Sequence, residues 1–369
     1  MDGSLAGGGG SVERGMGGLE RGGSRGVMGP LEETRWQSWA RGGAPGGPGG
    51  RRMTSFGARN ISRLVRDHAP HGFVGDLHPD VTLISTRNAE WARRWGLVLD
   101  GATARREAAV RCGTFAAHTY PTADEELVQL GADLVSWLCL LDDLSGEGLP
   151  GEATTLRQHY ADFEVILRSG RLPVEPPPFH RALLDLRHRA LARADRRWLE
   201  RFADAMASYF RGCELEHCYR LAGVSPHPRE HRELRSSSIG AQLVFALIEL
   251  HTGLLTPLER ASPQLMELRK TGALLCAWLN DISSYPKMCV AEEPLNLVAA
   301  LARQHSLTPQ EALAAAIQVF RTDAAMLEAL LDALRYQAAP PAVLDFAQGV
   351  ERWVRGNSAW TGLRRRCLT

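Results

Sequence analysis

A helical repeat of apolar residues runs through most of this chain and limits what it can fold into. From about Trp91 onward, leucine, alanine, valine and isoleucine recur at intervals of three and four residues, and short loops rich in glycine and proline separate the repeats. This spacing places apolar side chains on one face of an α-helix, whereas a half-buried strand alternates in steps of two. Strand-like alternation is scarce, so the sequence predicts an all-α protein.

The stretch 125–141 shows the pattern clearly, because its leucines fall along one helical face. These leucines are Leu127, Leu130, Leu134, Leu138 and Leu141. The chain has no repeat at a fixed longer period, which disfavours an α-solenoid and favours a single helical-bundle domain with a central cavity. The clearest predicted helices span residues 125–141, 195–221, 237–252, 263–285, 308–335 and 341–360.

The first 55 residues differ in composition from the rest. They contain nearly half of the chain's 37 glycines, several arginines and few aliphatic residues. Such a segment buries too little apolar surface to offset the entropy of the chain. We therefore expect a disordered Gly/Arg-rich tail at 1–55, a linker at 56–79 and a helical domain at 80–369.

The charge balance restricts the partners that the chain can attract. With 43 basic and 42 acidic side chains the net charge is +1, so no overall field favours nucleic acid or an anionic membrane. No apolar run reaches the roughly 18 residues that span a bilayer, and the N-terminus lacks the apolar core of a signal peptide. The seven cysteines have no paired spacing and are expected to be reduced. We expect a cytoplasmic protein with no membrane span and no nucleic-acid partner.

An acidic cluster follows the stretch 125–141. Asp142 comes four residues after Leu138, so it continues the apolar face of that helix and is expected to point inward. An inward carboxylate is costly unless it is paired or binds a cation. Asp143 and Glu147 add two carboxylates, which favours a metal site. The alternative is a helix end that leaves Asp143 and Glu147 in water while an arginine neutralises Asp142.

A second polar cluster lies in the run NDISSYPK. Asn280 and Ser284 are four residues apart and share a helical face, and Mg²⁺ accepts such side-chain oxygens together with water and phosphate. Lys287, about one turn onward, can meet a phosphate group as a point charge. The alternative is a polar helix end at which Pro286 stops the helix.

Two basic features point to an anionic ligand. Arg235 is expected to open the helix over 237–252, where its guanidinium and the free amides of the first turn both attract an anion. The C-terminal run WVRGNSAWTGLRRRC places the consecutive arginines Arg364 to Arg366 beside Trp353 and Trp360, either as a simple basic tail or as a phosphate clamp. Together with the two polar clusters, these features predict a divalent-metal and phosphate site between helices.

Taken in order, these motifs resemble those of bacterial class I terpene synthases, over about residues 80–369. The segment ending LCLLDDLSGE resembles the helix with the aspartate-rich metal motif, and LRSSSIGA resembles the segment with the diphosphate-sensing arginine. NDISSYPKM resembles the Asn/Ser/Glu metal motif, and EPLNLVAAL the segment after it. WVRGNSAWTGLRRRC resembles the terminal stretch that ordinarily closes with an Arg-Tyr pair. Each motif is modestly specific alone, but five in this order are strong.

The resemblance implies a terpene synthase or cyclase, a carbon–oxygen lyase that ionises an isoprenoid diphosphate and cyclises the carbocation to a hydrocarbon or alcohol. It implies a helical bundle of the isoprenoid-synthase type and a cluster of three Mg²⁺ ions, for which Mn²⁺ is an expected substitute. Farnesyl diphosphate is the expected substrate, and the expected assembly is a monomer or a homodimer. The implied metal ligands are Asp142, Asp143, Glu147, Asn280 and Ser284.

The resemblance also implies residues that contact the substrate. Arg235, Lys287 and Arg366 would stabilise the charge that develops on the leaving diphosphate. Trp353 aligns with a cavity tryptophan whose ring face stabilises a cation, although an ordinary core tryptophan is the alternative. The remaining implied substrate-binding positions are Ser238, Ile239, Leu138 and Cys139.

Several positions depart from the family's pattern. Met288 stands where the Asn/Ser/Glu motif has its acidic ligand, and a thioether is a poor ligand for a hard cation. Glu292, one turn onward, is a candidate substitute. Cys367 replaces the terminal tyrosine, and Leu138 and Cys139 occupy positions that are often aromatic. These departures leave a catalytically silent isoprenoid-diphosphate binder or helical interaction protein as the alternative, whereas a chain-elongating prenyl synthase would need a second aspartate-rich cluster in place of NDISS.

Overall fold

The computed structural model describes residues 76–98, 112–146, 153–291 and 294–366, all of which belong to a compact unit that spans 51–369. Within these ranges only the backbone is described for 143–146, 153–156, 287–291 and 362–366. The described residues form helices and no strand, which confirms the predicted all-α class. In the same part of the chain, no helix is both long enough and apolar enough to cross a membrane. The predicted tail and all but the last residues of the predicted linker lie outside the described residues.

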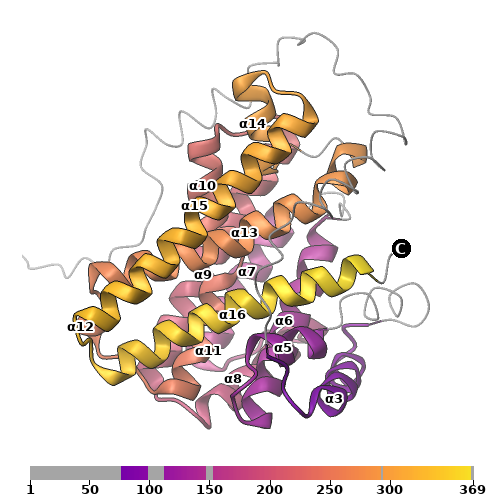
Figure 1. The fold of residues 1–369 in the computed structure, drawn as a ribbon. Coiled ribbons are helices and arrows are strands. Elements are labelled where there is room, and N and C mark those ends of the chain that lie inside the picture. The colour runs from indigo at the N-terminus through magenta and orange to yellow at the C-terminus, as the bar shows by residue number, and fades with distance from the viewer. Residues whose placement is uncertain (1–75, 99–111, 147–152, 292–293, 367–369) are drawn as a thin grey trace, which may run out of the picture. The chain divides into compact units, whose positions relative to one another are not determined.

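The helices are named as in Figure 1 and follow one another along the chain in this order. They are α3 (Val81–Arg94), α5 (Cys112–Thr119), α6 (Glu125–Gly146), α7 (Ala153–Ser169), α8 (Pro178–Leu191), α9 (Arg196–Ala222), α10 (Pro228–Ser238), α11 (Ala241–Thr252), α12 (Pro257–Arg260), α13 (Pro263–Ala291), α14 (Leu297–His305), α15 (Pro309–Tyr336) and α16 (Pro341–Arg366).

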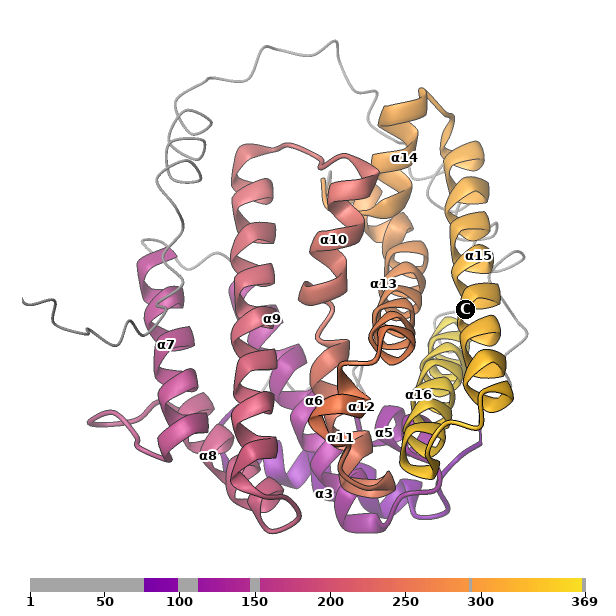
Figure 2. The same ribbon diagram turned by 90° about the vertical axis from the view of Figure 1, so that its left-hand side faces the viewer.

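Two helices organise the packing of the described part. α13 contacts α10, α11, α14, α15 and α16, while α6 contacts α3, α5, α8 and α11. Figure 2 shows α7, α9, α10, α13 and α15 standing next to one another in that order, and each neighbouring pair is in contact. This order brings the consecutive helices α9 and α10 together with α13, which follows later in the sequence.

Buried tryptophans connect these helices because each combines a large apolar ring with one N–H donor. Trp137 on α6 donates its indole N–H to the carbonyl of Phe179 on α8 at 3.0 Å. Trp198 on α9 donates to the carbonyl of Ala246 on α11 at 3.1 Å. Trp278 on α13 donates to Asp323 Oδ2 on α15 at 2.7 Å. Each ring therefore fixes two helices against each other through packing and through a directional bond.

The predicted helices at 125–141, 195–221 and 308–335 are confirmed as α6, α9 and α15. The predicted burial of the leucine face of α6 is confirmed too, since all five leucines are at most 9 % exposed. The predicted helix at 237–252 is wrong at its start. The chain leaves α10 after Ser238, Gly240 adopts φ +73°, and α11 begins only at Ala241. This left-handed backbone suits glycine, which has no Cβ to clash.

The alternative in which Pro286 stops the helix is also wrong, because α13 continues through this proline to Ala291. A proline lacks the N–H that would bond four residues back. Ile282 and Tyr285, in the turn before this proline, are buried in the core and hold the helix leading into it. The helix at the C-terminus likewise runs further than predicted, to Arg366.

We predict that Gly356→Ala lowers the free energy of unfolding by about 1 to 3 kcal/mol, because overpacking forces the backbone to shift. A Cβ on Gly356 of α16 would lie 2.0 Å from the backbone oxygen of His118 on α5. Urea unfolding of the two proteins measures the difference. Gln318→Ala, at an exposed position of α15, is the control and is expected to change stability by less than about 0.5 kcal/mol. Equal effects of the two substitutions would contradict the close contact.

Candidate functional site

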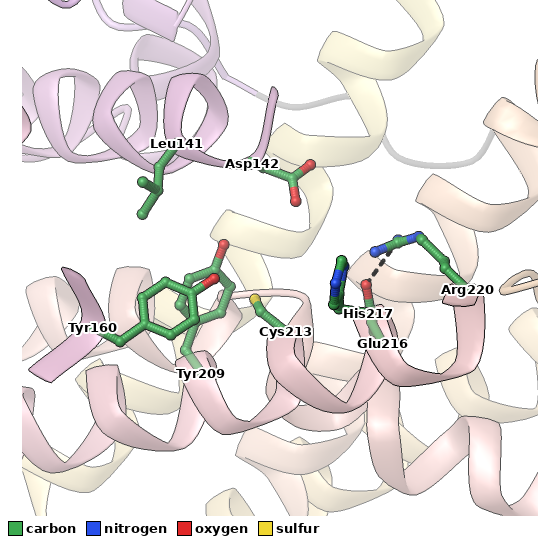
Figure 3. Close-up of a pocket in the computed structure, with 8 residues that line it drawn as sticks. All are labelled: Leu141, Asp142, Tyr160, Tyr209, Cys213, Glu216, His217 and Arg220. Atoms are coloured by element: carbon green, nitrogen blue, oxygen red, sulfur yellow. Dashed lines mark hydrogen bonds and ion pairs between the residues drawn. The ribbon is translucent and has the colours of Figure 1, made fainter. Parts of the chain in front are cut away.

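A pocket opens where the end of α6 faces α9. Its lining residues on α6 and α7 are Leu141, Asp142 and Tyr160, and those on α9 are Tyr209, Cys213, Glu216, His217 and Arg220. Figure 3 shows the carboxylate of Asp142 projecting from the end of α6 above this row of α9 side chains. The predicted acidic cluster therefore lies at the rim of a pocket.

Asp142 points toward the pocket and α9, but the expected burial of its carboxylate is wrong, because the side chain is exposed. Leu138 and Leu141 beside it are buried, with exposed fractions of 9 % and 7 %. The helix then reaches the pocket, so Asp142 is exposed. The carboxylate keeps its contact with water, so burial does not compel it to bind a cation. Whether a metal binds at this position therefore depends on the neighbouring groups.

Arg235 is the centre of the polar groups beside this pocket, and it is only 8 % exposed. Its Nη1 donates to Glu216 Oε1 on α9 at 2.9 Å, and its Nη2 donates to Asn280 Oδ1 on α13 at 3.1 Å. The same Nη2 lies 3.1 Å from Asp281 Oδ1 in an ion pair. The hydroxyl of Ser238 also donates to the Glu216 carboxylate. One guanidinium thus joins α9, α10 and α13.

Arg235 lies in the last turn of α10, so the expectation that it opens the following apolar helix is wrong. The break at Ile239 and Gly240 separates it from the first amides of α11. Its attraction for an anion therefore comes from its own charge and not from a helix N-terminus. Ser238 is buried beside Glu216, and Ile239 packs partly buried against the core.

The charges around Arg235 are balanced despite their burial. Burial opposes the charge of this guanidinium, but Asp281, Glu216 and the more distant Asp142 outweigh it and raise its pKa. Burial likewise opposes the ionisation of Glu216 and Asp281, yet Arg235 and other partners hold the pKa of each carboxyl below its usual value. Arg220 Nη2 adds a second positive charge, 3.0 Å from Glu216 Oε2. All four groups are therefore charged at neutral pH.

Asp281 is further held by groups from two other elements. His231 Nε2 on α10 lies 2.7 Å from Asp281 Oδ2, and the backbone N–H of Leu297, the first residue of α14, donates to the same oxygen at 2.9 Å. The side chain of Asn296 donates to the backbone carbonyl of Asp281 at 2.8 Å. The residue next to Asn280 is thus fixed in place on several sides.

Asn280 and Ser284 share a face of α13, as predicted. Asn280 is exposed and Ser284 half-buried, and the hydroxyl of Ser284 donates to the backbone carbonyl of Asn280 at 2.7 Å. A side-chain carbonyl oxygen has two lone pairs, so Asn280 Oδ1 can accept from Arg235 and bind a second partner. With Asp142, these residues offer three hard oxygen donors, a set that fits a divalent cation such as Mg²⁺.

The two predicted polar clusters both interact with the guanidinium of Arg235. Asn280 meets Arg235 through a hydrogen bond, and the charge of Asp142 acts on Arg235 from the opposite wall. Several predicted residues cannot be placed in this way. The structure does not describe the side chains of Asp143, Lys287, Met288 and Arg366. The residues that lie outside the described ranges altogether are Glu147, Glu292 and Cys367.

Trp353 is 4 % exposed and lies in the core. Phe115 and Phe245 meet its ring edge to face, with centroids at 5.4 Å and 5.5 Å. Of the other two predicted substrate contacts, Leu138 is buried and Cys139 half-buried on α6. A role for these three side chains toward a substrate stays a prediction.

Sequence reasoning missed Glu216 and Asp281, the two carboxylates that hold Arg235. A signal for Glu216 exists, because it follows Tyr209 and Cys213 on one helical face, and a charged residue on an apolar face needs a partner. Asp281 gives the same signal, because it too is a charged residue on the apolar face of its helix. Neither signal identifies Arg235 as the partner, since 19 and 46 residues of sequence separate the pairs.

Comparison with protein families finds that residues 133–323, more than half of the chain, match the model described as terpene synthase family 2, C-terminal metal binding. The matched segment includes Asp142, Arg235, Asn280 and Ser284. The chain is 27 % identical over 293 residues to a (2E,6E)-farnesyl diphosphate-cyclising (+)-T-muurolol synthase of Roseiflexus castenholzii, covering 78 % of this chain and 90 % of the relative. It is 25 % identical over 292 residues to germacrene A synthase of Nostoc punctiforme, with coverage of 78 % and 90 %.

Solved structures share the fold. Linalool/nerolidol synthase from Streptomyces clavuligerus, in complex with 2-fluorogeranyl diphosphate, superposes with a TM-score of 0.70 at 23 % identity and covers 77 % of this chain and 99 % of its own. Germacradien-4-ol synthase from Streptomyces citricolor superposes with a TM-score of 0.68 at 23 % identity, with coverage of 79 % and 97 %. The helical arrangement described above is therefore that of these enzymes.

We predict that Glu216→Gln lowers the free energy of unfolding by about 3 kcal/mol, because it leaves the buried Arg235 without one of its counter-charges. The same substitution at Glu233, whose exposed carboxylate lies 3.0 Å from Lys270 Nζ, is the matched control and is expected to cost less than about 1 kcal/mol. Urea unfolding at neutral pH compares the two. Similar losses for both variants would contradict the role given to Glu216.

The difference between the wild type and Glu216→Gln should also depend on pH. Because the folded pKa of Glu216 is lowered, its contribution is complete above its unfolded pKa of about 4.3 and is lost as the pH falls through the folded value. The difference in unfolding free energy is therefore expected to be largest near neutral pH and to shrink below about pH 4. A difference that stays constant down to acid pH would show that charge is not its source.

Proposed function

The chain belongs to terpene synthase family 2, and from that membership we propose that it ionises farnesyl diphosphate and cyclises the carbocation to a terpene hydrocarbon or alcohol. As a terpene synthase it is a metal-dependent lyase that acts on an isoprenoid diphosphate. The choice of farnesyl diphosphate is supported by relatives such as the (+)-T-muurolol synthase, which cyclises that substrate. The observation that carries the proposal is Arg235, held charged between two carboxylates beside Asn280.

Asp142, Asn280 and Ser284 are the described residues that would hold the metal, because they offer the hard oxygen donors that Mg²⁺ prefers. A bound divalent cation supplies Lewis-acid neutralisation of the charge on the diphosphate oxygens. We propose Mg²⁺ as the ion, in a cluster of three that Mn²⁺ can replace. Asp143 and Glu147 are the further proposed ligands on the α6 side.

Arg235 would assist the ionisation itself. When the allylic C–O bond breaks, its electron pair stays on the diphosphate oxygen and the positive charge stays on the carbon chain. A guanidinium has five N–H donors, and those not directed to Glu216, Asn280 or Asp281 can donate to that oxygen charge. Because Glu216 and Asp281 already fix the orientation of Arg235, little reorganisation is needed during the reaction. Lys287 and Arg366 are proposed to add further positive charge.

The alternative, a catalytically silent diphosphate binder, rests on Met288 and Cys367 alone, and family membership does not favour it. The donors on the described part of the site are those that an active enzyme needs, since Asp142, Asn280 and Ser284 are all retained. We propose that Met288 weakens the binding of one metal ion without abolishing turnover, because a thioether is a poor substitute for a carboxylate.

We predict that Asn280→Ala lowers kcat/KM for farnesyl diphosphate about 100-fold, because it removes a metal ligand and a contact of Arg235. Purified protein is incubated with Mg²⁺ and substrate, and the products are read by gas chromatography with mass spectrometry. Ser283→Ala, in which a hydroxyl bonded to its own helix backbone is lost, is the control and should retain most of the activity. No product from the wild type with geranyl, farnesyl or geranylgeranyl diphosphate, and none from Met288→Glu, would overturn the enzyme assignment.

We predict that Met288→Glu lowers the Mg²⁺ concentration needed for half-maximal rate, by about 10-fold, because a carboxylate replaces a thioether at the third position of the motif. Titration of the rate with Mg²⁺ at saturating substrate gives this concentration. Met288→Gln is the matched control, since it has the same length as glutamate but no charge, and a smaller change is expected. An unchanged or raised Mg²⁺ requirement in Met288→Glu would show that the position does not face the metal.

A further inference from the structure

Three side chains that can bind a metal come together between α7 and α8, on residues that the proposed reaction does not use. His159, Asp162 and His180 each offer one ligand atom, and these three atoms lie within 4.8 Å of one another. His159 and Asp162 are three residues apart on one face of α7, and His180 is in the first turn of α8. Figure 2 shows these two helices packed together at one end of the row of helices.

His180 is buried without the partners that its ring requires. It is 1 % exposed, and neither of its ring nitrogens has a hydrogen-bond partner among the described residues. Its Nε2 lies 3.5 Å from Asp162 Oδ2, which is longer than a normal hydrogen bond. His159 Nδ1 is also buried without a partner. An unsatisfied buried polar group costs about 1 to 3 kcal/mol, and a metal ion that takes the lone pair of an imidazole nitrogen would remove part of this cost.

We propose that His159, Asp162 and His180 form a transition-metal site, with Zn²⁺ as the ion, that fastens α7 to α8. Two imidazoles and one carboxylate are a common ligand set for Zn²⁺, and water completes its tetrahedron. Ligands at about 2.0 to 2.2 Å from the ion lie roughly 3.3 to 3.5 Å apart. The separation of 3.5 Å between His180 Nε2 and Asp162 Oδ2 already meets this condition.

The surroundings hold the ligands in the required form and direction. Burial, together with the neighbouring His159, lowers the pKa of His180 against the opposing effect of Asp162, and the neutral imidazole is the form that binds metal. Gln158 Nε2 donates to Asp162 Oδ1 at 2.9 Å, which leaves Oδ2 on the side of His180. Phe163 packs against the His180 ring with a centroid distance of 4.7 Å. Such outer contacts orient metal ligands in proteins.

The ion would also stiffen one wall of the pocket in Figure 3. Tyr160, the residue after His159, lines that pocket and stacks on Phe210 of α9 with ring centroids 4.1 Å apart. A metal at the cluster would fix α7 and thereby the position of Tyr160. The hard-cation donors Asp142, Asn280 and Ser284 include no imidazole, so the two sites differ in the metal that they prefer.

The experiment uses the full chain without a histidine tag, stripped with a chelator and dialysed into buffer with millimolar Mg²⁺. After addition of Zn²⁺ and gel filtration, mass spectrometry of the elements counts the zinc retained, and differential scanning calorimetry gives Tm. We expect an equimolar amount of zinc and a rise in Tm, because a ligand that binds the folded state stabilises it. Co²⁺ in place of Zn²⁺ should give the visible absorption of a tetrahedral nitrogen and oxygen site.

Variants locate the ion. His159→Gln and Asp162→Asn, both at half-buried positions, are expected to lose the retained zinc and the rise in Tm, and they carry the test if His180→Asn fails to fold. His188→Gln, at an exposed position of the same α8, is the matched control and should keep both. No retained zinc in the wild type would overturn the proposal. Equal zinc in the wild type and in both α7 variants would also overturn it, and loss in Asp142→Asn instead would move the ion to the other site.

Discussion

The guanidinium of Arg235 lies between two buried carboxylates, and this interaction constrains the helices around the site. Glu216 belongs to α9 and Asp281 to α13, while Arg235 lies in the last turn of α10. Removing any one of the three would leave a charge in the protein interior without its counter-charge, which costs far more than an exposed pair does. The three helices are therefore held in one arrangement, and α14 joins them because its first backbone N–H also donates to Asp281. The arrangement of this part of the bundle is set by charge as well as by apolar packing.

The same interaction would prepare the guanidinium of Arg235 for the diphosphate that we propose as its ligand. A free arginine would have to give up conformational freedom and hydration when the anion binds, whereas Arg235 has already done so within the folded protein. Asn280 is placed by its bond to Arg235, and the field of Asp142 reaches the guanidinium from α6. The two walls that carry the proposed metal ligands thus both interact with the guanidinium of Arg235. The break at Gly240, which ends α10 next to Ser238, leaves the Ser238 hydroxyl on the Glu216 carboxylate.

Much of this fold follows from the sequence, because apolar spacing along a helix is local information. The leucine face of α6 and the extents of α9 and α15 could be predicted from the spacing of apolar residues within each segment alone. The predictions failed where distant contacts decide the outcome. α13 continues through Pro286, and Ile282 and Tyr285 pack the turn before it into the core. Asp142 is exposed because the end of α6 meets a pocket and not the core. Local patterns do not encode how helices pack. They therefore do not predict that Arg235 meets its two carboxylates, or that His180 of α8 lies beside His159 and Asp162 of α7. The motifs identify the candidate site residues through resemblance, while the structure shows the contacts that fix Arg235 and Asn280 in place.

The role proposed for Arg235 is best tested by a crystal structure of the protein with Mg²⁺ and inorganic diphosphate, which shows where the anion and the ions bind. We expect diphosphate oxygens within hydrogen-bond distance of Arg235, with metal ions on Asp142 and on the pair Asn280 and Ser284. Glu216 and Asp281 are expected to keep their contacts with the guanidinium. Diphosphate bound elsewhere, or metal ions that leave both donor clusters empty, would contradict it.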